Sequence, residues 1–303
     1  MPSRWIRTSM AKSELFLGID GGGTRCRARL CDASGHKLAE AEAGPANIRL
    51  GLKEAFASVF EVTLNCLEQA HLSSQDLPRI TACLALAGAT EPADLAAAKL
   101  HEQSFGRAIL TSDAHAACVG AHEGRDGAVL IIGTGSIGWA VVRGRHHRVG
   151  GWGLPISDEG GGAWLGVETL RRVLMAHDGR TPWTPFLRAA FERFGSDAHA
   201  IVGWVARALP RDLGSLAPGV LEYAMRDDPA AVELMRLAAR HLDAVATRLH
   251  LLGATRLALL GGLAPSMEQW LSAGTRRNVV PPAGDAVAGA LQLARLATRS
   301  AAA

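Results

Sequence analysis

The chain has 303 residues, of which 48% are hydrophobic and 20% are charged, and its formal net charge is +3. That length allows two domains, each with a core of its own. Lys and Arg are scattered and aromatic residues make up only 5% of the chain, so a nucleic-acid-binding surface is not expected. No apolar run approaches the roughly 18 residues that span a bilayer, and residues 1–11 lack the apolar core of a signal peptide. We therefore expect a soluble cytoplasmic protein with no nucleic-acid or membrane partner.

The five cysteines are odd in number and none forms a C-x-x-C pair. This pattern is typical of a reduced protein whose cysteines act as small apolar residues. It also argues against a zinc site, because His146 and His147 have no cysteine cluster near them in the sequence.

The first part of the chain reads as an antiparallel meander followed by alternating helices and strands. Residues 15–19 form an apolar run that ends in Asp20 and three glycines, and alternating segments follow at 25–31 and 37–43. In this pattern the first strand is followed directly by a second, antiparallel strand. In a dinucleotide-binding unit the first strand is instead followed by a helix. The later expected elements are helices at 53–70, 92–103 and 114–122, and strands at 80–86 and 107–110.

The meander pattern then occurs a second time. Strands are expected at 128–132, 138–142 and 146–149, with a glycine turn at 133–135. A long amphipathic helix at 229–252 and a strand at 256–260 follow. This weak duplication predicts two related α/β domains, at 12–115 and 116–284, with the two glycine turns on opposite walls of an interdomain cleft. A final helix within 285–303 is expected to pack back on the first domain.

Three glycine turns suit a bound nucleotide. Backbone N–H groups of Gly21, Gly22 and Gly23, with the Thr24 hydroxyl beside them, can hold phosphates, and Asp20 can hold Mg²⁺ directly or through water. The segment Gly133, Thr134 and Gly135 repeats this arrangement. Gly261 and Gly262 would let an adenine ring lie against bare backbone. The first turn can also be only a hairpin, and the last only a strand-to-helix turn.

The order of these turns resembles that of the actin/hexokinase/Hsp70 superfamily of ATPases, in which two phosphate loops precede an adenosine loop. The resemblance implies a duplicated, ribonuclease H-like fold of two domains, with ATP and Mg²⁺ bound between them. It also implies a general base at the start of the helix that joins the domains, and Asp113 stands at that point. Asp113 can instead be only a helix N-cap, and His115 is expected to be structural.

Further segments resemble the bacterial glucosamine and N-acetylglucosamine kinases of the BadF/BadG/BcrA/BcrD ATPase group. They are GIDGGGT (18–24), GPANIRLG (44–51), LALAGA (84–89), SDAHAA (112–117), IIGTGSIG (131–138), GGWGLPISDEG (150–160), DGRTP (178–182) and ALPRDLG (208–214). The resemblance implies an ATP-dependent kinase that phosphorylates the 6-hydroxyl of an amino sugar, with Asp113 taking the proton. It also implies a possible homodimer. The implied sugar contacts are Asn47, Gly88, Asp113, Gly151, Trp152, Asp158 and Glu159.

Other interpretations of these residues remain open. Asn47 can be a turn residue, Trp152 a core residue, and Asp158 with Glu159 the start of a helix. Ile137 stands where animal N-acetylglucosamine kinases carry Asn, so the sequence does not choose between glucosamine and its N-acetyl form.

Other functions of the whole chain also remain open. An ATPase that activates a radical dehydratase would need cluster cysteines, and none follows Cys118. A repressor of the ROK type would need a DNA-binding helix pair, for which the segment before Leu15 is too short. A sugar sensor without catalysis is the hardest alternative to exclude.

Overall fold

The computed structural model describes residues 14–89 and 105–299. The expected helix at 92–103 and the basic segment 1–11 lie outside the described residues. The chain divides into two compact units, one comprising residues up to 124 together with those from 284, and the other comprising 125–283. The expected boundary at residue 116 lies inside helix α3 (Asp113–His122), which is part of unit 1.

Unit 1 contains a five-stranded sheet in the order β3-β2-β1-β4-β5. Strands β1 (Leu15–Gly21), β2 (Cys26–Asp32) and β3 (Lys37–Ala43) form the predicted antiparallel meander. Strands β4 (Ile80–Leu86) and β5 (Arg107–Ser112) run parallel to β1. The first strand continues two residues beyond the predicted end, so that Asp20 and Gly21 belong to β1 and the turn comprises 22–25.

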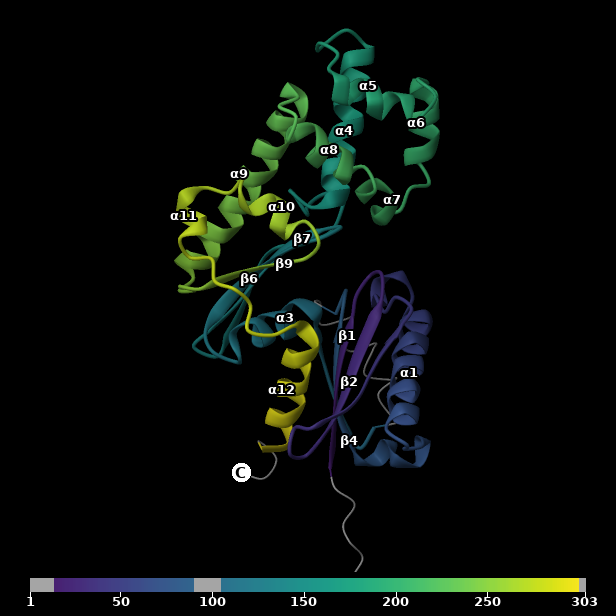
Figure 1. The fold of residues 1–303 in the computed structure, drawn as a ribbon, viewed down its shortest axis with the longest axis vertical. Coiled ribbons are helices and arrows are strands. Elements are labelled where there is room, and N and C mark those ends of the chain that lie inside the picture. The colour runs from purple at the N-terminus through teal and green to yellow at the C-terminus, as the bar shows by residue number, and fades with distance from the viewer. Residues whose placement is uncertain (1–13, 90–104, 300–303) are drawn as a thin grey trace, which may run out of the picture. The chain divides into compact units, whose positions relative to one another are not determined.

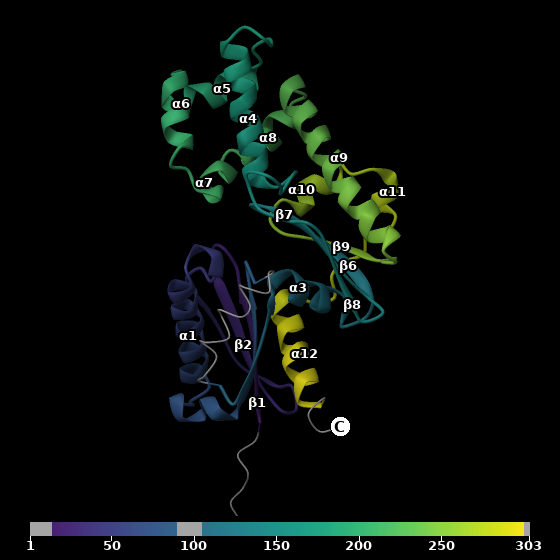
Figure 2. The same cartoon turned by 180° about the vertical axis from the view of Figure 1, so that it is seen from behind.

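Helices cover both faces of this sheet (Figures 1 and 2). Helix α1 (Leu52–Gln69) packs on one face, where its buried side chains join those of β1, β2 and β4 in one core. Helices α3 and α12 (Ala286–Arg299) pack on the other face, around Phe16 and Cys83. The contact of α12 with β1 is close, because a Cβ added to Gly18 would lie 2.6 Å from the Val287 carbonyl oxygen. Short 3₁₀ helices occur at Ile48–Leu50 and Ser74–Arg79.

Unit 2 contains a four-stranded sheet in the order β8-β7-β6-β9. Strands β6 (Gly127–Ile132), β7 (Ser136–Val142) and β8 (Arg145–Gly150) form a second antiparallel meander, and β9 (Leu257–Leu260) runs parallel to β6. The first sheet has the same arrangement in β3-β2-β1-β4. The second sheet therefore repeats the topology of the first, as the predicted duplication requires.

The remainder of unit 2 is helical. Its longest described helix, α9 (Pro229–Leu251), begins where Asp228 caps the N–H groups of Ala230 and Ala231. Buried residues at spacings of three and four, such as Leu242, Ala246 and Leu249, turn one face of α9 to the core. The helices are α4 (Gly162–His177), α5 (Pro185–Glu192), α6 (Ala198–Val205), α7 (Pro210–Gly214), α8 (Ala217–Ala224), α9 (Pro229–Leu251), α10 (Ala264–Glu268) and α11 (Ala273–Arg276).

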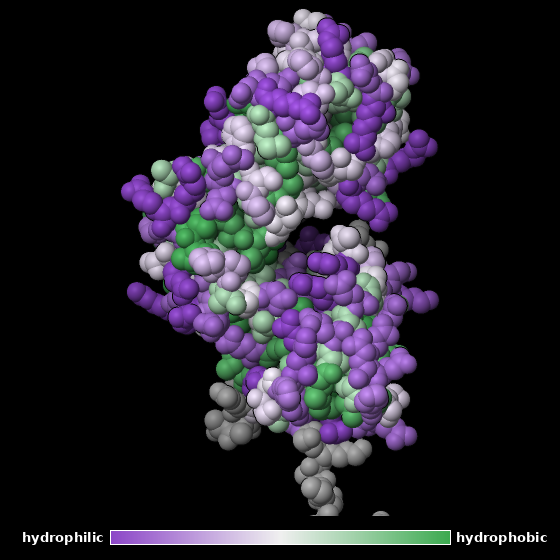
Figure 3. Space-filling view, viewed as in Figure 1, coloured by the Kyte–Doolittle hydropathy of each residue, from purple (hydrophilic) through white to green (hydrophobic). Residues whose placement is uncertain are grey.

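Polar side chains cover much of the face seen in Figure 3. Among the described residues, no helix is both long and apolar enough to cross a membrane. All five cysteines are buried and free of disulfides. Burial raises the pKa of Cys26, Cys66 and Cys83 to about 12, so these thiols are protonated at neutral pH and pack as small apolar residues.

Candidate active site

In unit 1, the predicted site residues gather at one edge of the sheet. Strands β1, β4 and β5 are parallel, and their register places Gly21 opposite Leu86, and Leu86 opposite Ser112. Asp20 therefore lies near the end of β1, while Gly88 and Asp113 follow the ends of β4 and β5. The carboxyl edge of parallel strands is where α/β proteins bind their ligands.

The first glycine turn is a tight hairpin in which the Gly22 N–H donates to the Arg25 carbonyl at 2.9 Å. Gly21 is needed for packing, since an added Cβ would lie 2.6 Å from a Leu86 methyl. Gly23 and Thr24 are exposed, and their N–H groups donate to no other residue in the part of the chain that the structure describes. The turn is thus a hairpin that also leaves two N–H donors available for a phosphate.

Asp20, the predicted metal ligand, forms an ion pair with Arg27. The Arg27 Nη2 lies 2.7 Å from Asp20 Oδ2, and Nη1 lies 3.3 Å from Oδ2 of Asp285. The side chain of Asp20 is 17% exposed. Mg²⁺ in phosphate-transfer sites commonly uses one or two carboxylates, with phosphates and water completing its shell, and Asp20 fits that requirement. Among the described residues, no group of three acidic, His or Cys side chains forms a fuller metal site.

Asp113 is the first residue of α3, and the N-cap position belongs to Ser112, whose hydroxyl accepts from the His115 N–H at 3.1 Å. The interpretation of Asp113 as the N-cap is therefore wrong. Burial raises the pKa of Asp113 to about 6, and the Asp20 carboxylate adds a smaller increase. The Ala114 N–H, which donates to Asp113 Oδ1 at 2.8 Å, lowers the pKa and so opposes the rise. His115 is held by a contact of 2.8 Å between its Nδ1 and the Thr111 hydroxyl.

Asn47 lies between the first glycine turn and Gly88. Its backbone forms a parallel bridge with Ala87, and its Oδ1 accepts from the Arg49 N–H at 3.0 Å. A Cβ added to Gly88 would lie 2.8 Å from Asn47 Oδ1, and one added to Gly23 would lie 3.9 Å from Asn47 Nδ2. Asn47 is thus both a cap of the following 3₁₀ turn and a neighbour of the glycines predicted to bind ligands.

In unit 2, the second glycine turn joins β6 to β7 and contacts the start of α4. The Gly133 N–H donates to the Gly135 carbonyl at 2.9 Å, and the Gly162 and Ala163 N–H groups donate to the carbonyls of Gly133 and Thr134, each at 2.8 Å. A helix N-terminus carries partial positive charge. The turn therefore lies in a field that favours a phosphate.

Gly261 and Gly262 lie beside this turn. Leu260 of β9 is opposite Ile131 of β6, so the two strands end together. Gly261 has a φ of 93°, and an added Cβ would lie 2.4 Å from the Ile132 carbonyl oxygen. In the part of the chain that the structure describes, no atom lies within 4 Å of a Cβ added to Gly262. The structure thus joins the predicted second phosphate turn and the predicted adenosine turn at one edge.

The loop after β8 returns to the same edge, because Gly150 is opposite Ile137, directly after the glycine turn. Ile137 also underlies Gly151, where an added Cβ would lie 2.5 Å from Ile137 Cγ1. Trp152 is 57% exposed, so its interpretation as a core residue is wrong.

Asp158 and Glu159 contact the second glycine turn and the loop after β8. Asp158 Oδ1 accepts from the Gly153 N–H at 2.9 Å, while Oδ2 would lie 2.1 Å from a Cβ added to Gly135. The Glu159 carbonyl accepts from the Ser136 hydroxyl at 2.7 Å. Helix α4 begins only at Gly162, after an N-cap at Gly161. The interpretation of Asp158 and Glu159 as a helix start is therefore wrong.

Sequence reasoning missed two arginines that hold predicted site residues. Arg27 holds Asp20, and the antiparallel register of β1 and β2, which pairs these two residues, would have revealed it. Arg148 contacts the loop that carries Trp152. The loop is irregular, so no sequence period could have indicated that contact.

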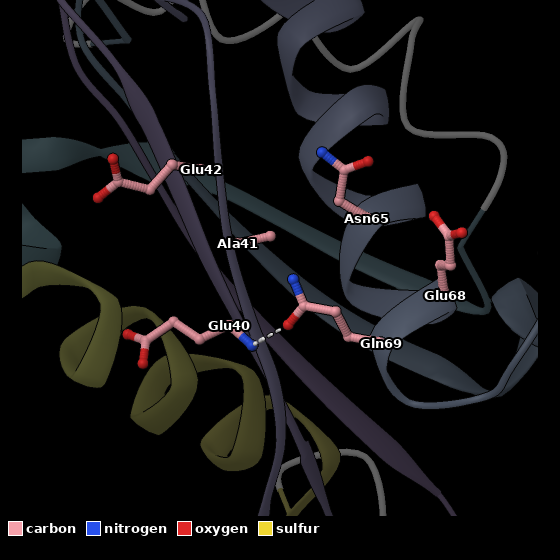
Figure 4. Close-up of a pocket in the computed structure, with 6 residues that line it drawn as sticks. All are labelled: Glu40, Ala41, Glu42, Asn65, Glu68 and Gln69. Atoms are coloured by element: carbon pink, nitrogen blue, oxygen red, sulfur yellow. Dashed lines mark hydrogen bonds between the residues drawn. The ribbon is translucent and has the colours of Figure 1, made fainter.

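A surface hollow between β3 and α1 includes none of these residues (Figure 4). It is lined by Glu40, Ala41, Glu42, Asn65, Glu68 and Gln69. Glu40 donates its N–H to Gln69 Oε1 at 3.4 Å. The three glutamate carboxylates that line the hollow would repel phosphates. The hollow is therefore no candidate for nucleotide binding.

Two repeated α/β sheets, each with a glycine turn after its first strand, confirm the predicted α/β fold of the actin-like type. The model of the BadF/BadG/BcrA/BcrD ATPase family matches residues 17–294. The chain belongs to this family.

Three comparisons describe its relatives. A glucosamine kinase of Vibrio cholerae is 40% identical over 92% of this chain and 95% of its own length. An N-acetylmuramic acid/N-acetylglucosamine kinase of Clostridium acetobutylicum is 29% identical over 75% of this chain and 76% of its own. A solved structure from Chromobacterium violaceum, provisionally named an N-acetylglucosamine kinase, is 36% identical and superposes with a TM-score of 0.87 over 93% of this chain and 99% of its own.

Proposed function

We propose that this protein is an ATP-dependent amino-sugar kinase that transfers the γ-phosphoryl group to the 6-hydroxyl of glucosamine or N-acetylglucosamine. The observation that carries the proposal is Asp113, a carboxyl group with a pKa of about 6 at the strand edge that also bears the first glycine turn. The identity of 40% to a glucosamine kinase over nearly the whole chain supports it.

The nucleotide would be held mainly by backbone. The N–H groups of Gly23 and Thr24 would donate to phosphates, because the Gly22 N–H is already bonded to the Arg25 carbonyl and Gly21 lies within β1. Thr134 and the glycines on either side of it would supply the second phosphate loop, and Gly261 and Gly262 would leave room for the adenosine. Mg²⁺, held by Asp20, would neutralise phosphate charge. Arg27 would keep the Asp20 carboxylate in place through its ion pair.

Each unit carries residues that would recognise the amino sugar. In unit 1, the Asn47 amide would hydrogen-bond near the sugar nitrogen and Gly88 would line the pocket. In unit 2, the ring of Trp152 would lie against carbon atoms of the sugar, beside Gly151, and the carboxylates of Asp158 and Glu159 would accept from its hydroxyls. The Asp158 bond to the Gly153 N–H would fix the loop that carries Trp152.

Asp113 would take the proton from the 6-hydroxyl as that oxygen attacks the γ-phosphorus atom. Only the ionised carboxylate can do so. Because burial raises its pKa to about 6, the active form prevails above that pH and is lost below it. A general base works best when its pKa lies near the working pH.

The pH profile should reflect this ionisation. We expect kcat/KM for the sugar to be constant above about pH 7 and to fall about tenfold for each pH unit well below 6. Enzyme held at pH 5 and assayed at pH 7.5 should recover fully, which separates titration from unfolding. A profile that stays flat down to pH 4.5 would show that Asp113 is not the titrating base.

ADP release from Mg-ATP tests the proposed function. Glucosamine, N-acetylglucosamine, glucose, N-acetylmuramic acid and a sample without sugar would be compared at one enzyme concentration. We expect one amino sugar to raise the rate at least tenfold above the sample without sugar, because closure on the sugar completes the catalytic site and excludes water as a competing acceptor. Equal rates in all five samples would reject the proposal.

Sedimentation of the same protein would test the homodimer that we also propose from the family resemblance.

A further inference from the structure

Arg148 binds the backbone of the loop that follows β8. Its Nε donates to the Gly150 carbonyl at 3.0 Å, and its Nη2 donates to the Gly151 carbonyl. Both glycines have left-handed backbone angles, with φ of 68° and 70°. One guanidinium group thus holds two successive carbonyls. The backbone there has left-handed angles that residues other than glycine seldom adopt.

The same guanidinium lies against Trp152. Its central carbon is 3.9 Å from the centroid of the indole ring, within the range of a cation–π contact. Trp152 is nevertheless 57% exposed, so much of the ring remains accessible to a ligand. Arg148 itself is half-buried.

We propose that Arg148 is a positioning residue that sets sugar affinity by holding Trp152 in its binding orientation. This role rests on the proposed function, in which Trp152 contacts the sugar. With glycines at 150, 151 and 153, a loop that has lost Arg148 and keeps only the Asp158 bond to the Gly153 N–H would sample more conformations, and sugar binding would have to select one of them. Preorganisation of this kind raises affinity without adding a contact to the ligand.

The central test compares Arg148→Gln with Arg145→Gln, a control on the same strand whose side chain is exposed. Sugar binding and nucleotide binding would each be measured by calorimetry, and kcat by ADP release. We expect Arg148→Gln to raise the Kd for the preferred amino sugar roughly tenfold. A change of that size matches the free-energy cost of ordering about one side chain on binding. The Kd for ADP and kcat should change less than about threefold. Arg148→Lys, which keeps the charge but loses the planar fork, should lie between wild type and Arg148→Gln.

A double-mutant cycle with Trp152→Ala separates positioning from a general structural role. If Arg148 acts through Trp152, Arg148→Gln should weaken sugar binding little further once the ring is absent. Fully additive effects would overturn the inference, as would a parallel loss of ADP binding and thermal stability in Arg148→Gln. Normal sugar binding by Arg148→Gln would overturn this inference alone, whereas a wild-type protein that binds no amino sugar would overturn the proposed function as well.

Discussion

Replacing Asp113 with Asn is expected to lower kcat for sugar phosphorylation by a factor of about 10²–10⁴, the usual contribution of a general base. Asn keeps an oxygen that can accept from the Ala114 N–H, as Asp113 Oδ1 does at 2.8 Å, but it cannot take a proton. The KM values for ATP and sugar should change only a few fold. Steady-state kinetics with the preferred sugar would measure both effects.

The folded state of this variant can be checked separately. Folding raises the pKa of Asp113 from 3.8 to about 6, so the carboxylate destabilises the folded state above pH 6 and this cost disappears below about pH 4. Asp113→Asn should therefore be at least as stable as wild type at pH 8. Glu68→Gln, at the hollow between β3 and α1, is the control and should leave kcat unchanged. A kcat within threefold of wild type in a folded Asp113→Asn protein would remove Asp113 from its proposed role.

Gly133→Ala should weaken nucleotide binding without unfolding the protein. No atom of residues 14–89 or 105–299 lies within 4 Å of a Cβ added to Gly133, so the methyl group has open space around it and would obstruct a ligand that approaches this backbone. If a phosphate approaches this backbone, displacing it should cost one or two charge-assisted hydrogen bonds, and the Kd for ATP should rise roughly 10–100-fold. Calorimetric titration with ADP and a non-hydrolysable ATP analogue would measure the change.

Gly203→Ala is the matched control, because a Cβ there also meets no described atom within 4 Å. Gly203 lies in α6 (Ala198–Val205), away from the glycine turns of unit 2. This control should leave nucleotide affinity unchanged, and both variants should unfold within a few degrees of wild type. A Gly133→Ala protein with unaltered nucleotide affinity would show that the second glycine turn does not approach a phosphate.

Much of the sheet structure could be predicted from the sequence, because side chains alternate along the meanders and glycines separate the strands. Strands β3 and β4 begin and end at the predicted residues. For β1 the sequence predicts an end that is two residues too early, since three successive glycines indicate a turn. In the structure, Gly21 continues the strand because it packs against Leu86 and Ala46, and that contact between distant residues is invisible in a local pattern.

The residues of the candidate site could be predicted from the sequence, but their arrangement in space could not. Parallel pairing of β1 with β4, and of β4 with β5, is needed to bring Asp20, Gly88 and Asp113 to one edge. The loop after β8 was the least predictable part, because its conformation depends on contacts that no periodicity encodes. Arg148 and Asp158 fix it through its backbone groups.

The most direct test of the proposed kinase activity is the stoichiometry of its products. The protein would be incubated with Mg-ATP and the preferred amino sugar, and ADP and sugar phosphate would be quantified in the same samples by chromatography and mass spectrometry. Our account predicts one sugar 6-phosphate for each ADP, with almost no ADP formed when the sugar is omitted. ADP that accumulates without any phosphorylated sugar would contradict it.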